Sequence, residues 1–141
     1  MLGKAIALAV DVHTGQKREG GNPYILHPLR VMMQMETTEE MIVAVLHDVI
    51  EDGDETVVDR LKEIFSQEIV EAIDCMSRRE GECYEDYIAR VMSNELARKV
   101  KISDIEDNIN VLELPVLKER HLKRLQKYHK IWGKLKGTVR V

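Results

Sequence analysis

Apolar residues recur at three- and four-residue spacing along most of the chain, which is the pattern of helices with one buried face. The first such run predicts a helix over residues 3–14. Residues 16–24 contain two glycines, an asparagine and a proline, and therefore predict a loop. Pro28 suits the first position of the next helix, which makes His27 its predicted cap.

Thr37, followed three residues later by Glu40, is a capping-box signature. It predicts a helix from about Thr38 to Val49. Further helices are expected near residues 56–64, 67–76, 84–92 and 95–109 and, after Pro115, near 117–133. Because no repeat, low-complexity segment or linker divides the chain, the pattern predicts one all-α domain over residues 1–141.

Composition narrows the classes of protein that fit this pattern. Only 4% of the residues are aromatic while 44% are hydrophobic, so the core must be aliphatic, and an all-β sandwich is not favoured. The net charge of -4 argues against a nucleic-acid surface. No apolar run reaches the roughly 20 residues that span a bilayer, and the start lacks a basic leader. We expect a cytoplasmic protein without a membrane partner, whose Cys75 and Cys83 are reduced, structural thiols.

The stretch AVLHDVIED, residues 44–52, places four polar groups on an otherwise apolar helix. On a continuous helix His47 shares a face with Glu51, and Asp48 shares a face with Asp52. Three carboxylates and an imidazole at the end of a buried helix repel one another and the negative end of the helix dipole. A divalent metal ion is the simplest counter-charge, and histidine and aspartate suit manganese, iron, cobalt or zinc.

Two more side chains can complete such a site. His27 lies shortly before this helix in the sequence, and Asp104 lies in a predicted core-facing helix. Two histidines and two aspartates would hold one ion and leave positions open for water. The alternative for a single His-Asp pair is an ordinary buried pair, and for Asp104 it is a solvated helix face. The remaining histidines are interpreted as structural: His13, His121 and His129.

Several motifs occur along the chain in the order found in a known family. They are Gly15-Gln16, Arg18, Pro23-Tyr24-Ile25, His27-Pro28, then LHDVIED and KISDIEDN. With them the chain resembles the HD-domain superfamily and, within it, the alarmone hydrolase domain of RelA/SpoT proteins and their small stand-alone relatives. The resemblance covers almost the whole chain. It implies a compact multi-helix HD-domain fold.

The resemblance also implies roles for individual residues. The metal ligands would be His27, His47, Asp48 and Asp104, with Mn²⁺ the usual ion. Glu51 and Asp52 correspond to the family's catalytic acidic pair. Arg18, Asn108 and Tyr128 match residues that contact the base, the sugar region and the nucleotide pocket. The implied reaction is cleavage of the 3′-pyrophosphate of ppGpp, which yields GDP and pyrophosphate.

Local cations are needed to hold a polyanionic substrate on an acidic protein. Arg78 and Arg79 are adjacent in a glycine-containing loop, and guanidinium groups suit a pyrophosphate. An exposed basic turn is an equally good interpretation of this pair. Lys99 and Lys101 are similar candidates.

Some positions depart from the family pattern. Glu19 and Gly20 stand where the family often has lysine and serine, and Gly53 stands where threonine is common. Ile105 and Asp107 replace an arginine and a histidine. These departures affect recognition of the base rather than the chemistry, so guanine specificity stays open.

Four functions are therefore weighed. The first is a metal-dependent pyrophosphohydrolase acting on (p)ppGpp, and the second is an HD phosphohydrolase acting on another nucleotide or phosphate ester. The third is a non-catalytic nucleotide-binding module. The fourth, a structural helical domain, would leave the acidic cluster without a counter-charge.

Overall fold

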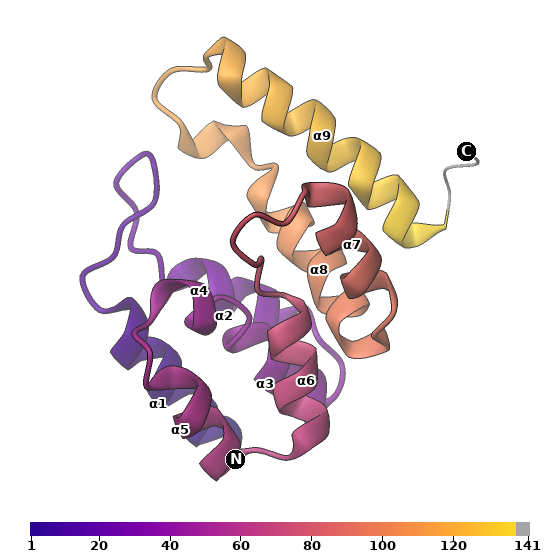
Figure 1. The fold of residues 1–141 in the computed structure, drawn as a ribbon. Helices are drawn as coiled ribbons and strands as arrows, with labels where there is room; N and C mark the ends of the chain where they lie inside the picture. Colours follow the sequence, from indigo (N-terminus) through magenta and orange to yellow (C-terminus); the bar gives the residue numbers. More distant parts are fainter. Residues whose placement is uncertain (138–141) are drawn as a thin grey trace.

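The computed structural model describes residues 1–137, and nearly all of its ordered elements are helices (Figure 1). They are α1 (Leu2–His13), α2 (Leu26–Met33), α3 (Thr38–Val45), α4 (Val49–Asp52), α5 (Val57–Ile64), α6 (Gln67–Cys75), α7 (Tyr84–Met92), α8 (Glu95–Asn108), the 3₁₀ turn η1 (Val111–Glu113) and α9 (Glu119–Lys136). One antiparallel bridge, between Lys17 and Pro23, is the only β-type pairing within residues 1–137. The predicted all-α class is confirmed. No helix in this part of the chain is long and apolar enough to cross a membrane.

Three helices form the centre of the molecule. α2 packs against α3, both contact α8, and α1 lies along α3. α9 crosses over α8 at one end, and α7 packs beside α8 (Figure 1). The core between them is aliphatic, as the composition predicts, with Val31, Val43, Leu46 and Ile105 fully buried. The helices that carry the polar motifs are thus the ones held most firmly by packing.

The predicted helix over residues 38–49 is interrupted in the structure. Its start is confirmed, because Thr37 and Glu40 form a reciprocal capping box. However, α3 ends at Val45, and a turn separates it from α4. The Nδ1 of His47 donates a hydrogen bond to the carbonyl of Ala44 at 2.6 Å, which satisfies an acceptor that the helix end leaves free. The break therefore rotates His47 out of the helical register assumed from the sequence.

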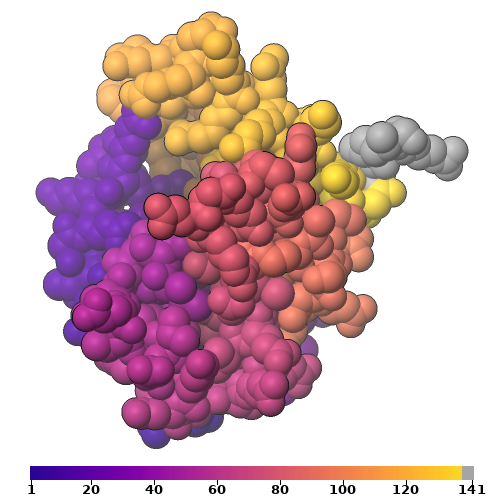
Figure 2. Space-filling view, viewed as in Figure 1, coloured from indigo at the N-terminus to yellow at the C-terminus, as the bar shows by residue number. Residues whose placement is uncertain are grey.

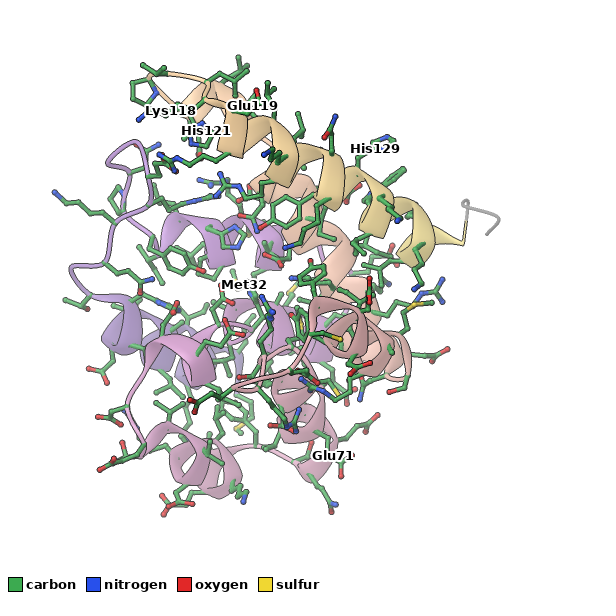
Figure 3. All side chains as sticks on the ribbon, turned by 45° about the horizontal axis from the view of Figure 1, so that its top comes forward. Met32, Glu71, Lys118, Glu119, His121 and His129 are labelled. Carbon is green, nitrogen blue, oxygen red and sulfur yellow. The ribbon has the colours of Figure 1, made fainter. Side chains whose placement is uncertain are left out.

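The predicted start of α2 is also corrected. The helix begins at Leu26, so His27 lies in its first turn and is not its cap. Pro28 fits there because the first turn of a helix needs no hydrogen bond from its backbone nitrogen. Nearby, Met32 (labelled in Figure 3) is buried, whereas Met33 is 72% exposed.

The loop before α2 is tied to the far end of the chain. Gly20 has φ +102°, and a Cβ atom there would lie 2.7 Å from the backbone oxygen of Glu113. Only glycine accommodates both the left-handed backbone and this close approach. The loop thus reaches the segment after α8, which brings Arg18 to the end of that helix.

The two cysteines are free thiols. Cys75 is half-buried at the end of α6, while Cys83 is exposed. The sulfur of Cys83 accepts a hydrogen bond from the backbone nitrogen of Asp86 at 3.4 Å and so caps α7.

Candidate metal centre and active site

Three of the four predicted metal ligands converge at one buried point. His27 comes from α2, His47 from the turn after α3, and Asp104 from α8. One possible ligand atom from each lies within 4.8 Å of the others, and Oδ1 of Asp104 lies 2.8 Å from Nε2 of His27 and 3.2 Å from Nε2 of His47. The fourth, Asp48, places Oδ2 3.0 Å from Nε2 of His47. Residues far apart in the sequence thus form one cluster of nitrogen and oxygen donors.

Hydrogen bonds orient both imidazoles toward the centre of this cluster. Nδ1 of His27 bonds to Asp107 at 2.6 Å, and Nδ1 of His47 bonds to the carbonyl of Ala44. Nδ1 therefore carries the proton, and Nε2 faces inward, as in metal-binding histidines. Nε2 of His47 is buried without a hydrogen-bond partner among the described residues. Such an orphaned nitrogen beside two aspartates fits a borderline divalent ion.

The charges in the cluster are strongly coupled. Burial alone would lower the pKa of His47, but the charges of Asp48 and Asp104 outweigh it and raise this pKa well above its usual value. The pKa of His27 is also raised, because hydrogen bonds to Asp104 and Asp107 outweigh burial. Both aspartates of the cluster have lowered pKa values: burial opposes ionisation, but the neighbouring cations prevail. The carboxylates are therefore ionised, and a metal ion bound at Nε2 would replace the second proton that the raised pKa values give each imidazole.

Asp104 is held in place by two neighbours on its own helix. Lys101 donates from Nζ to Oδ2 at 2.8 Å, and Asn108 donates from Nδ2 to Oδ1 at 3.0 Å. The hydroxyl of Tyr24 donates to Asp48 on the other side of the cluster. Each carboxylate therefore has a fixed orientation.

The predicted catalytic pair lies at the rim of the cluster. Oε1 of Glu51 accepts a hydrogen bond from the backbone nitrogen of Arg78 at 2.6 Å. Asp52 accepts one from Nε2 of Gln16 at 3.2 Å, and Nδ1 of His13 lies 3.7 Å from the same oxygen. Desolvation of the Glu51 carboxylate, with the charges of Asp48 and Asp52, raises the pKa of Glu51. A carboxylate with a raised pKa at the edge of a metal site is suited to exchange protons.

The predicted nucleotide-binding residues adjoin this centre. Nη2 of Arg18 donates to the side-chain oxygen of Asn108 at 2.7 Å, so these two residues are linked to Asp104. They line a pocket of about 90 Å³ together with Tyr128 and Arg124 of α9. In Figure 2 the indigo-to-purple N-terminal part faces the orange-to-yellow C-terminal part across this region. The structure thus brings Arg18, Asn108 and Tyr128 together.

The two arginines of the α6–α7 loop have different partners. Arg78 lies against Glu51, whereas the guanidinium group of Arg79 pairs with exposed Asp74 at 2.8 Å. Of the lysine candidates, Lys101 reaches the cluster, whereas Lys99 pairs with Glu40 at 2.6 Å. The structure therefore brings the ammonium group of Lys101 to the cluster and the backbone of Arg78 to Glu51 at its rim.

Glu19 is bound to α9 and does not project into open space. Its Oε1 pairs with Arg120 at 2.6 Å and with Nε2 of His121 at 2.9 Å. Figure 3 shows His121 beside Lys118 and Glu119 at the start of α9, and His129 further along the helix. Glu19 thus anchors the N-terminal loop to the last helix.

Several residues at the site were not identified as functional from the sequence. Asp107 was noted only as a departure from the family, yet it bonds to His27, Arg18 and Arg30. Tyr24 is part of the Pro23-Tyr24-Ile25 motif, but no local pattern in the sequence indicates its contact with Asp48. Both contacts join segments distant in the sequence, so only the fold reveals them.

Comparison with known proteins agrees with this geometry. The model of the HD domain family matches residues 5–100, and the chain belongs to this family. A divalent metal ion is accordingly implied, and the His27, His47 and Asp104 cluster provides a possible site.

Relatives named as alarmone enzymes are similar over most of the chain. A guanosine-3′,5′-bis(diphosphate) 3′-pyrophosphohydrolase of Aquifex aeolicus is 29% identical over 136 residues, which cover 88% of this chain and 19% of the relative. Its Vibrio cholerae counterpart is 34% identical over 110 residues, which cover 75% of this chain and 15% of the relative. The bifunctional (p)ppGpp synthase/hydrolase SpoT of Escherichia coli is 31% identical over 124 residues, which cover 85% of this chain and 17% of the relative. The chain spans less than a fifth of the length of these curated relatives.

A solved structure supports the fold. It is that of a metazoan ortholog of SpoT described as hydrolysing ppGpp, and it has a TM-score of 0.80 to this chain at 19% identity. The alignment covers 97% of this chain and 86% of the other. The HD-domain arrangement of helices is therefore shared along nearly the whole length.

Proposed function

We propose that this chain is a single HD hydrolase domain that cleaves the 3′-pyrophosphate of ppGpp, giving GDP and pyrophosphate, with one divalent metal ion. The observation that carries the proposal is the convergence of two histidines and two aspartates, with a small pocket lined by Arg18, Asn108 and Tyr128 beside them. The names of the relatives support this substrate. Under this proposal the protein acts in the cytoplasm on a small nucleotide, without a nucleic-acid or membrane partner.

The ligands in this proposal are His27, His47, Asp48 and Asp104, and Mn²⁺ is the expected ion. Two imidazole nitrogens and two carboxylates suit manganese, with iron, cobalt and zinc as alternatives. When bound, such an ion makes water acidic enough to act as a nucleophile near neutral pH and offsets charge on phosphoryl oxygens.

The remaining roles belong to side chains of the chain itself. Glu51 and Asp52 would orient the attacking water, accept its proton and return a proton to the leaving oxygen. Arg18, Asn108 and Tyr128 would hold the nucleoside part of the substrate. Arg78 would contact the pyrophosphate, whereas Arg79, paired with Asp74, is the weaker candidate.

The test is pyrophosphate release from ppGpp by the purified chain with added Mn²⁺, beside a chelator control. Metal-dependent release is expected. The proposal is wrong if the metal-loaded chain leaves ppGpp intact.

One structural feature favours a second candidate, an HD phosphohydrolase with a different nucleotide substrate. Glu19, where the family often has a lysine, is bound to Arg120 and His121, so no cation is available at this position. A panel of other nucleotides and phosphate esters in the same assay separates the two candidates. Turnover of another nucleotide with none of ppGpp would favour the second.

A further inference from the structure

Tyr84, at the start of α7, has a hydroxyl group that is buried and makes no hydrogen bond within residues 1–137. The other buried side-chain atoms of this kind are Nε2 of His13 and Nε2 of His47. A buried polar group without a partner is destabilising. An unpaired hydroxyl beside an active site therefore indicates a ligand that completes it.

Two cations from different segments contact the ring of Tyr84. Nζ of Lys127, on α9, lies 3.8 Å from the ring centroid, and the guanidinium carbon of Arg78 lies 5.3 Å from it. Figure 2 shows the rose α6–α7 loop between α9, in orange to yellow, and the magenta part of the chain. Cation–π contacts of this kind hold both charges beside the phenol.

The charge at this position is not neutralised by the protein. Among the described residues, neither Lys127 nor Arg124 pairs with a carboxylate, and the side chain of Arg78 donates only to the carbonyl of Glu82. Burial and the charges of Arg78, Lys101 and Arg124 all lower the pKa of Lys127. An excess of positive charge on a protein of net charge -4 indicates that an anion binds there.

The position of Tyr84 connects the two parts of the site. Lys127, whose ammonium lies over the ring of Tyr84, is next to Tyr128 of the nucleotide pocket in α9. The backbone of Arg78 also bonds to Glu51. The segments that contact the Tyr84 ring thus lead to Glu51 on one side and to the nucleotide pocket on the other.

We infer that Tyr84, Lys127 and Arg78 form a diphosphate-binding wall, in which the Tyr84 hydroxyl donates a hydrogen bond to a phosphoryl oxygen. Lys127 and Arg78 offset the charge of the diphosphate, and Arg78 adds a planar donor group suited to its oxygens. This assignment rests on the proposed function, because it places the diphosphate to be released beside Glu51. It also explains why the fold leaves the hydroxyl unpaired.

The test is a calorimetric titration of the full chain with inorganic pyrophosphate, after dialysis to remove divalent metal. Tyr84→Phe deletes only the hydroxyl, and Lys127→Gln deletes only a charge. We expect Tyr84→Phe to weaken pyrophosphate binding about tenfold, which equals about 1.4 kcal/mol. Lys127→Gln should weaken it by a similar factor that shrinks as salt is added. The control is Lys130→Gln, at an exposed lysine of the same helix, which should bind as the wild type does.

Thermal melting distinguishes binding from a structural role. Because the hydroxyl has no partner in the fold, Tyr84→Phe should melt at the wild-type temperature or above it. Unchanged pyrophosphate affinity in both Tyr84→Phe and Lys127→Gln would overturn the inference, as would a wild-type chain that does not bind pyrophosphate.

The outcome is separable from the proposed function. If the chain cleaves ppGpp but both variants bind pyrophosphate normally, only the diphosphate-binding wall is wrong. If Tyr84 governs pyrophosphate binding but ppGpp is not cleaved, the wall stands and the proposed reaction is wrong.

Discussion

Asp107 offers the sharpest test of how the proposed metal site is built, because it orients His27, a predicted ligand, and is not itself predicted to bind the metal. Its carboxylate accepts four hydrogen bonds: from Nδ1 of His27 at 2.6 Å, from Nε and Nη2 of Arg30 at 2.7 and 3.0 Å, and from Nη1 of Arg18 at 3.2 Å. The variant Asp107→Asn keeps the size of the side chain but offers one acceptor oxygen and one amide donor. If the amide faces His27, Nδ1 must accept, and the proton moves to Nε2, the atom that should bind the metal.

The expected loss of metal affinity follows from this change in the orientation and protonation of His27. Removing the partner of a metal-binding histidine typically weakens metal affinity 10- to 100-fold, about 1.4–2.7 kcal/mol. The side chain of Arg30 is 41% exposed, so its ion pair with Asp107 contributes only about 1 kcal/mol to stability. We therefore expect Asp107→Asn to lose more free energy of metal binding than of unfolding.

The assay is a competition titration of Mn²⁺ against a fluorescent chelator, with urea unfolding measured on the same samples. Glu106→Gln is the matched control, because it removes one negative charge from the adjacent, exposed position of α8. Equal Mn²⁺ affinity in Asp107→Asn and wild type would refute the role assigned to Asp107.

Three further predictions concern the surroundings of the site. A Cβ atom at Gly53 would lie 2.6 Å from the backbone oxygen of Val49 and would also meet Val57, so Gly53→Ala should lower the free energy of unfolding by about 1–3 kcal/mol in urea titrations; an unchanged midpoint would contradict this packing. Gln16→Ala should lower kcat with bound metal unchanged, because it releases Asp52; loss of metal instead would show that Gln16 supports the ligands. A hydrogen bond from Arg90 lowers the pKa of Glu82 from 4.5 to about 2, so this pair stabilises the fold above pH 4.5 and loses its effect as the pH falls toward 2. Urea midpoints at pH 6 and pH 3 should therefore differ less in Glu82→Gln than in wild type, and equal differences would exclude this pair as a source of the acid sensitivity.

Local signals predicted most of the helices. The capping box at Thr37 and Glu40 and the apolar spacing of the later segments involve neighbours in sequence, so they are visible without the fold. The break after α3 is different. The run from Ile42 to Ile50 is apolar apart from His47 and Asp48 and contains no glycine or proline, so no residue in it is typical of a turn. At the turn, His47 bonds locally to the carbonyl of Ala44 and places Nε2 3.2 Å from Asp104 of α8. The contact with Asp104 is tertiary, so it cannot be predicted from the local sequence.

The candidate site was likewise only partly predictable from the sequence. Residue types and a family resemblance predict His27, His47 and Asp104 as ligands, and the structure brings these three residues together. Their supporting partners were not identified, because Asp107 and Tyr24 act across contacts between distant segments. Arg79 illustrates the reverse case: its adjacency to Arg78 suggested a shared role, but the loop turns its side chain toward Asp74.

The most direct test of the central proposal measures bound metal and pyrophosphate release on the same samples of three proteins loaded with Mn²⁺. Wild type should hold about one ion per chain and release pyrophosphate from ppGpp. His47→Gln should lose both properties, whereas Glu51→Gln should keep the ion and lose at least about a hundredfold in rate. A His47→Gln protein with a full complement of metal and wild-type turnover would contradict the account.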